Sequence, residues 1–346
     1  SQPTPSLLRR FSAPVKLKNV PLARQQFLAL NDTDPFARWE AGQQVATHLL
    51  LEMVAAYRRG DKLSLDPELV TQMRRTLAAG EKDPAFAAEA LSLPSESFLA
   101  DQMEVVDVDA IHAARDFARC QIGVALQGEF DALYERLTER GTYSVDGAAI
   151  GRRALRNVAL GYLALGGGAA GVTRAKAQFD NGTNMTDVLA ALSVLNEFDD
   201  PARGEALAKF YERWKADELV TDKWFSLQAL SSLPSTLARV KELTHHPAFT
   251  IKNPNRMRSL VGAFTQANQL RFHDASGAGY AFLADQVITL DPLNPLMASR
   301  LIQPLGQWRR HDTARQALMK RELERVLARP SLSKNTYEMA SKSLGA

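Results

Sequence analysis

The feature that most constrains the fold is a dipeptide, Asp-Pro or Asn-Pro, that recurs along the chain ahead of apolar residues at helical spacing. It occurs at Asp34-Pro35, Asp66-Pro67, Asp83-Pro84, Asp200-Pro201, Asn253-Pro254, Asp291-Pro292 and Asn294-Pro295. The Asp or Asn side chain accepts hydrogen bonds from the unpaired amides of a first helical turn, while proline has no amide to lose there and already has a helical φ. Most of these pairs therefore predict helix starts.

The first pair shows the pattern most clearly. Apolar residues recur on one helical face from Asp34 onward, and Gly60 follows as a stop signal. The members of this face are Phe36, Trp39, Ala46, Leu49, Leu50, Met53 and Tyr57. The same spacing follows Asp66 and returns in later stretches at 111–126, 152–165, 185–195 and 202–214. The chain is predicted to be helical almost throughout.

Residues 11–17 are the exception, because their alternation is typical of a short strand. A strand needs a partner, and no other segment supplies one, so we expect at most a short N-terminal strand remnant. The remaining segments predict an all-α fold, an α-solenoid or superhelix of irregular antiparallel helix pairs of the armadillo or HEAT kind. We place a boundary after residue 18 and assign 19–346 to one helical domain.

Composition excludes several classes of protein. The 346 residues are 45% apolar and 23% charged, close to the averages of globular proteins. Basic and acidic side chains number 42 and 39, and the densest basic clusters, at 152–153 and 309–310, are short, so no nucleic-acid partner is expected. The most apolar stretch, 158–172, is too short and too rich in glycine to span a bilayer, so no membrane partner is expected.

No motif in the sequence predicts catalysis or metal binding. Gly166, Gly168 and Gly171 have the spacing of a dinucleotide-binding loop, but a helix precedes them where that motif needs a strand, so they predict a helix stop. His245 and His246 are adjacent and point in different directions, which favours a solvated turn between helices. We therefore expect no catalytic residue and no metal ligand in this chain.

Several strings, in the same order along the chain, resemble the C-terminal region of bacterial aminopeptidase N, a zinc metallopeptidase family. They are PSLLRRFSAPVKL (5–17), NMTD (184–187), DKWF (222–225), FT (249–250), NPNR (253–256), RSL (258–260) and ASRLI (298–302). The resemblance covers essentially the whole chain. It implies that residues 1–18 are the remnant of a preceding β-sandwich domain or a linker, and that the helical domain caps an active site and lines the substrate channel.

The resemblance also implies what the parent protein does. That family removes N-terminal residues from peptides with a zinc-polarised water and a carboxylate general base. Its His-Glu-x-x-His and Gly-x-Met-Glu-Asn motifs belong to earlier domains and are absent here. The implied zinc therefore lies in another domain, no cofactor binds this chain, and the chain alone is expected to be inactive. The implied partners are the catalytic and β domains of the same polypeptide and peptide substrates, in the cytoplasm.

The resemblance places Arg258 and Arg300 on the channel wall, where they can meet the carboxylate end or the backbone carbonyls of a peptide. Each follows an Asn-Pro helix start, where a cation gains nothing from the helix dipole. The planar fork of arginine can also grip a carboxylate with two hydrogen bonds. Asn253, Asn255 and Arg256 are accessory candidates near the same wall. The alternative for the two arginines is an ordinary ion pair with a neighbouring helix.

Two other functions remain open at this point. A self-standing solenoid adaptor would bind a protein in its groove with defined stoichiometry and no catalytic partner. A nucleic-acid-binding helical repeat would show a steep salt dependence of binding.

Overall fold

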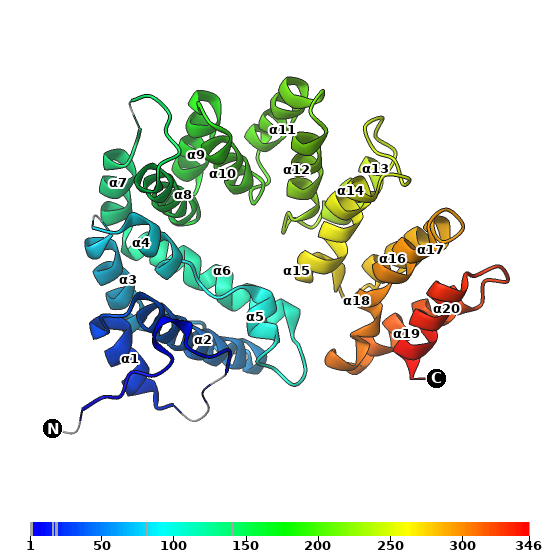
Figure 1. Cartoon of the computed structure of the whole chain (residues 1–346), viewed down its shortest axis with the longest axis horizontal. Coiled ribbons are helices and arrows are strands. Elements are labelled where there is room, and N and C mark those ends of the chain that lie inside the picture. The colour runs from blue at the N-terminus through cyan, green and yellow to red at the C-terminus, as the bar shows by residue number, and fades with distance from the viewer. Residues whose placement is uncertain (1–2, 16, 18–19, 81, 140, 346) are drawn as a thin grey trace. The chain divides into compact units, whose positions relative to one another are not determined.

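The computed structural model describes residues 3–15, 17, 20–80, 82–139 and 141–345. Within these ranges the regular structure is helical and no residue lies in a strand (Figure 1). The prediction of an all-α fold is confirmed. The chain divides into two compact units, Ser1–Leu99 with Ala110–Leu195, and Ala100–Asp109 with Asn196–Ala346. The boundary that we place after residue 18 stays a prediction.

The first unit contains one 3-10 turn and most of ten α-helices. They are η1 (Arg9–Phe11), α1 (Leu22–Asn31), α2 (Pro35–Arg59), α3 (Pro67–Ala79), α4 (Pro84–Ala90), α5 (Glu96–Ala100), α6 (Val108–Ala125), α7 (Gln127–Arg136), α8 (Gly147–Gly167), α9 (Ala169–Asn181) and α10 (Met185–Leu195). The end of α5 and the start of α6 belong to the second unit. Neighbours in sequence pack on each other, as in α1 with α2, α7 with α8 and α9 with α10.

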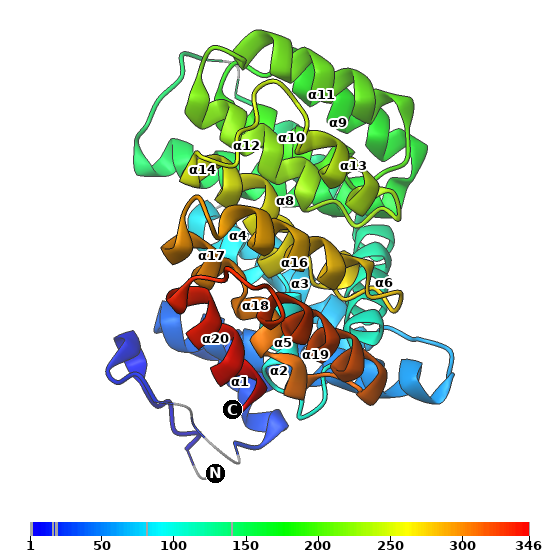
Figure 2. The same ribbon diagram turned by 90° about the vertical axis from the view of Figure 1, so that its right-hand side faces the viewer.

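The second unit continues the same pattern with shorter helices. They are α11 (Pro201–Trp214), α12 (Glu218–Ala229), α13 (Thr236–Leu243), α14 (Pro254–Met257), η2 (Arg258–Ala267), α15 (Gln269–Phe272), α16 (Ala278–Leu290), α17 (Pro295–Leu301), α18 (Gln303–Gly306), η3 (Trp308–Arg310), α19 (Thr313–Leu327) and α20 (Lys334–Leu344). Helices α16 and α17 pack on α19 and α20, and Figure 2 shows these pairs as successive layers. Helices that pack on their neighbours in sequence are the arrangement of a solenoid.

Six of the seven predicted helix starts are observed, and in each the Asp or Asn side chain accepts a hydrogen bond from a first-turn amide. They are Asp34, Asp66, Asp83, Asp200, Asn253 and Asn294. Asp291 differs, because it ends α16 and its carboxylate instead accepts from the amide and hydroxyl of Ser333, ahead of α20. The predicted stop at Gly60 is also observed, with a φ of 78°.

The possible strand at 11–17 is not observed in the described residues of that segment; Lys16 lies outside them. Residues 9–11 form a 3-10 turn that packs back on the helices instead. Arg9 pairs with Asp32 at 2.9 Å, the Arg10 amide donates to Asp34, and the Phe11 and Phe36 rings lie 5.2 Å apart. The prediction was wrong because, without a partner strand, these polar groups find acceptors near the start of α2.

The two other motifs weighed in the sequence lie in turns. Gly168, with a φ of 53°, separates α8 from α9, so the predicted helix stop is confirmed. His245 is exposed, but His246 packs edge-on against Tyr211, with ring centroids 4.9 Å apart, and also contacts Trp224. The prediction of a solvated turn was therefore wrong for His246, because aromatic side chains of α11 and α12 pack against its ring.

The described residues lack two features, a metal-binding cluster and a membrane-spanning helix. No three His, Cys, Asp or Glu side chains in them come together as a metal-binding group. None of the helices in the same ranges combines the length and apolarity needed to cross a membrane.

Two glycines allow α6 and α8 to approach closely. A Cβ atom on Gly123 would lie 2.3 Å from the Tyr162 carbonyl oxygen, and one on Gly166 would lie 2.5 Å from the Gly123 carbonyl carbon. Both distances are far inside van der Waals contact with main-chain atoms, which cannot rotate away. The close crossing therefore requires glycine at both positions.

We predict that Gly123→Ala lowers the free energy of unfolding by about 1–3 kcal/mol, because the helices must move apart. Urea denaturation measures this. Gly161→Ala, in the partner helix α8, is the matched control, since its Cβ would meet nothing within 4 Å. It should raise the free energy of unfolding by about 0.4–1 kcal/mol. Equal effects of the two substitutions would contradict the close crossing.

The core of the second unit contains a stacked pair of histidines. The rings of His273 and His311 lie 4.1 Å apart, and the residues are only 5% and 4% exposed. Tyr280 lies 3.0 Å from His273 Nδ1, while His311 Nδ1 is buried with no hydrogen-bond partner among the described residues. Burial lowers the pKa of both rings, and nearby Arg315 lowers it further; that of His311 falls to about 4. Both are therefore neutral at pH 7.

Because these folded-state pKa values lie below the ordinary 6.5, the unfolded chain binds more protons and stability falls as the pH drops below 6.5. We predict a loss of up to about 1.4 kcal/mol per pH unit for each histidine as the pH falls below 6.5, which for His311 continues to about pH 4. Urea denaturation at pH 7 and pH 5 measures it. His311→Phe keeps the stacked ring without the proton, and should remove about half of the dependence. An unchanged dependence would contradict the assignment.

Candidate functional site: an arginine-lined pocket

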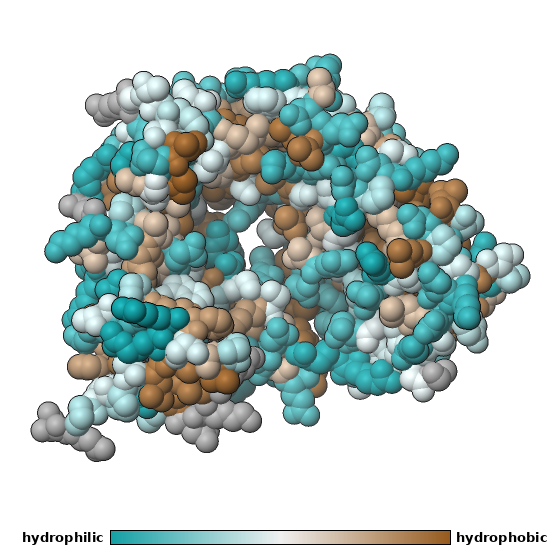
Figure 3. Space-filling model, viewed as in Figure 1, coloured by the Kyte–Doolittle hydropathy of each residue, from teal (hydrophilic) through white to brown (hydrophobic). Residues whose placement is uncertain are grey.

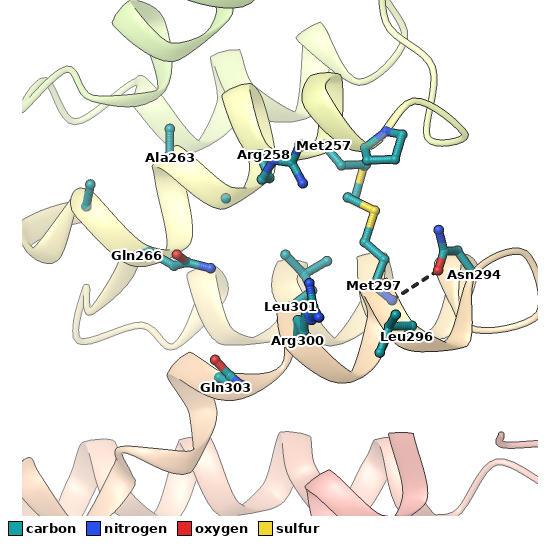
Figure 4. Close-up of a pocket in the computed structure, with 13 residues that line it drawn as sticks. Met257, Arg258, Ala263, Gln266, Asn294, Leu296, Met297, Arg300, Leu301 and Gln303 are labelled. Carbon is teal, nitrogen blue, oxygen red and sulfur yellow. Dashed lines mark hydrogen bonds between the residues drawn. The ribbon is translucent and has the colours of Figure 1, made fainter. Parts of the chain in front are cut away.

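A pocket of about 740 Å³ lies in the second unit, between η2 on one wall and α17 with α18 on the other (Figure 4). Its lining residues are Pro254, Met257, Arg258, Gly262, Ala263, Gln266, Ala267, Asn294, Leu296, Met297, Arg300, Leu301 and Gln303. Arg258 and Gln266 come from the η2 wall, and Arg300 and Gln303 from the opposite wall. The structure thus brings together the two arginines that the sequence singled out, 42 residues apart in the chain.

Neither arginine has an acidic partner in the described chain. Arg258 is exposed and donates only to the side-chain oxygen of Asn255, one turn earlier. Arg300 is also exposed, and in the described ranges its side chain makes no hydrogen bond or ion pair. No Asp or Glu is among the lining residues. Two positive charges therefore face one cavity without a countercharge on its walls, so the cavity favours an anionic ligand.

The rest of the pocket is apolar with a few amide groups. Met257 is fully buried, Leu301 is nearly so, and Leu296 is 54% exposed at the rim. Gln266 and Gln303 offer exposed amides from the two walls. Apolar walls with a few polar groups are typical of sites that bind small organic molecules, and the volume lies in the range of such sites.

The accessory candidates separate into two groups. Asn255 touches Arg258 and so belongs to the pocket's edge. Asn253 caps α14, where its side chain accepts from the amides of Asn255 and Arg256, and it does not line the pocket. Arg256 is buried, pairs with Asp222 and donates to two main-chain carbonyls. Asn253 and Arg256 therefore stabilise the segment that carries the pocket wall and do not themselves line the pocket.

Gln266, Gln303 and the unusual helix that carries the first of them were not predicted from the sequence. Residues 258–267 form a π-helix, whose hydrogen bonds join residues five apart. The sequence held no signal for this winding, because the apolar positions 257, 260, 261 and 264 have the spacing of an ordinary α-helix.

The chain belongs to the family described as "Domain of unknown function (DUF3458_C) ARM repeats", which matches residues 23–345. It is 42% identical over 344 residues to aminopeptidase N of Caulobacter vibrioides, covering 99% of this chain and 40% of that protein. Identities to aminopeptidase N of Haemophilus influenzae and of Escherichia coli are 40% and 38%, again over 99% of this chain and 39% of each relative. The chain spans about 40% of the length of these curated relatives.

A solved structure supports the same assignment. The crystal structure of Legionella pneumophila aminopeptidase A in complex with aspartic acid matches with a TM-score of 0.90 and 30% identity, over 100% of this chain and 41% of that one. Together with the family match, these similarities confirm the predicted resemblance to the C-terminal region of aminopeptidase N and the ARM-like fold.

The geometry predicts opposite roles for neighbouring arginines. Arg256→Ala should lower the free energy of unfolding by about 1–3 kcal/mol, because it removes the ion pair of the half-buried Asp222 carboxylate. Arg258→Ala and Arg300→Ala should each change it by less than about 0.5 kcal/mol, because these exposed side chains form no ion pair. Urea denaturation of the three variants measures this. A large loss for Arg258 or Arg300 would show that they are structural.

Proposed function

We propose that this chain is the helical part of a zinc aminopeptidase that removes N-terminal residues from peptides, where it caps the active site and lines the path to it. The relatives that it matches are named aminopeptidase N, and it spans about 40% of their length. The zinc ligands that the family resemblance implies, in a His-Glu-x-x-His pair, are not in this sequence. We therefore assign the zinc and the chemistry to the remainder of the polypeptide, in the cytoplasm, and expect the chain alone to be inactive.

The observation that carries the proposal is the pair of arginines without acidic partners in one pocket. A salt bridge within the described chain does not explain them, because no carboxylate there pairs with Arg300 and only an amide oxygen accepts from Arg258. The carboxylate end of a peptide supplies the missing charge, since each guanidinium can donate two parallel hydrogen bonds to it.

The remaining walls suit a peptide as well. Gln266 and Gln303 carry amides that both donate and accept hydrogen bonds, as backbone amide groups require. Met257, Met297 and Leu301 supply apolar contact beside them. No acidic lining residue repels the carboxylate.

An exposed apolar surface in the first unit fits the proposed partner. Leu7, Phe11, Val15 and Phe27 are 48%, 58%, 56% and 51% exposed. Figure 3 shows apolar side chains gathered over α1 and the segment before it. Contiguous exposed apolar surface marks an interaction site. We assign this surface to contact with the remainder of the same polypeptide.

We predict that Arg258→Ala and Arg300→Ala, in the full-length polypeptide, raise KM about tenfold for a peptide with a free C-terminal carboxylate, because a charge-assisted hydrogen bond is lost. The same peptide with an amidated C-terminus should be unaffected. Steady-state kinetics with both peptides measures the difference.

The matched control is Arg329→Ala, an exposed arginine outside the pocket whose side chain has no partner in the described ranges. It should change neither KM. Unchanged kinetics of the pocket variants on both peptides, with normal folding, would rule out the carboxylate-binding role.

A further inference from the structure

The π-helix η2 determines which residues face the pocket. Its lining residues are Arg258, Gly262, Ala263, Gln266 and Ala267. In an α-helix, the nine steps from Arg258 to Ala267 would turn the chain by about 900°, which places the two residues on opposite faces. In a π-helix the same face returns after between four and five residues, so all five positions fall on one wall.

The opposite face of η2 is buried. Met257, Val261 and Thr265 form one row, and Leu260 and Phe264 lie beside them. This face packs on α12. The pocket-lining face of η2 is therefore the one turned away from α12.

Side-chain hydrogen bonds join α12 to η2 near both ends of η2, and we call these two groups of bonds the two fastenings. Near the start, the Ser226 hydroxyl donates to the Ser259 carbonyl at 2.9 Å, and the Ser259 hydroxyl donates to Asp222 at 3.2 Å. At the end, the Asn268 side-chain amide donates to the Ala229 carbonyl at 2.9 Å and to the Ser231 carbonyl at 2.8 Å.

The two fastenings span a shorter length on α12 than nine α-helical steps of η2 would. Asp222 and Ala229 are seven residues apart, which is about 10 Å along an α-helix. Ser259 and Asn268 are nine residues apart, which would be about 13 Å in an α-helix. A π-helix has more residues in each turn and a smaller rise per residue, so its length over nine steps comes closer to the shorter span.

We infer that Ser226 and Asn268 are positioning residues for the pocket: by fastening η2 to α12 at both ends, they hold residues 258–267 in the π winding that sets Arg258 and Ala267 on one wall. The use of that wall for peptide binding rests on the proposed function, whereas the winding does not. Neither positioning residue lines the pocket.

The double variant Ser226→Ala/Asn268→Ala tests the inference through a crystal structure of the chain. Without the two fastenings, the main-chain hydrogen bonds of 258–267 should change from five-residue to four-residue spacing, and Ala267 should leave the wall. Retention of the π winding in this variant would overturn the inference.

If the double variant does not fold, Ser226→Ala alone decides, because it removes a single bond from a half-buried serine. Amide hydrogen exchange of 258–267 should then accelerate about tenfold, and Ser226→Thr, which keeps the hydroxyl, should restore the wild-type rate. Ser343→Ala is the matched control, since that half-buried hydroxyl also donates to a carbonyl, within α20. Equal exchange in all variants would overturn the inference.

Kinetics in the full-length polypeptide separates this inference from the proposed function. Ser226→Ala should raise KM for the peptide with a free carboxylate about threefold, leave kcat unchanged, and be rescued by Ser226→Thr. If Ser226→Ala changes the winding but Arg258→Ala has no kinetic effect, the proposed function fails and the positioning role stands. If Arg258→Ala acts as expected and the winding survives loss of both fastenings, only the positioning role fails.

Discussion

The constraint on which the structure depends is that the first amides of every helix need acceptors. Asp or Asn followed by proline supplies them at six helix starts. Two of these caps also build the candidate site. Asn253 begins the helical segment that carries Arg258, and Asn294 begins the helix that carries Arg300. Each arginine lies five or six residues after its cap, so the position of the cap sets the position of the arginine on its helical segment.

Helix starts and stops could be predicted because their causes are local. The acceptor oxygens of Asp34 or Asn294 and the positive φ of Gly60 and Gly168 depend on a few neighbouring residues. The strand at 11–17 was predicted wrongly, because its alternation says nothing of the carboxylates between α1 and α2 that accept from Arg9 and Arg10. The conformation of that segment depends on contacts with residues more than twenty positions away in the sequence.

In the candidate site, too, features with local causes could be predicted and features that depend on distant contacts could not. Spacing and resemblance together selected Arg258 and Arg300, and the structure brings them to one pocket. Nothing in the sequence predicted that the accessory candidate Arg256 is structural, because that role depends on its burial beside Asp222. The π winding was missed for a related reason. It depends on contacts with α12, which lies more than thirty residues away.

We propose that this chain shapes the route to a catalytic centre that lies elsewhere in a longer polypeptide. The most direct measurement is the zinc content and aminopeptidase turnover of the purified chain beside the full-length polypeptide. The account predicts bound zinc and turnover in the full-length polypeptide, and neither in the folded chain alone. Stoichiometric, tightly bound zinc together with turnover in the chain alone would contradict it.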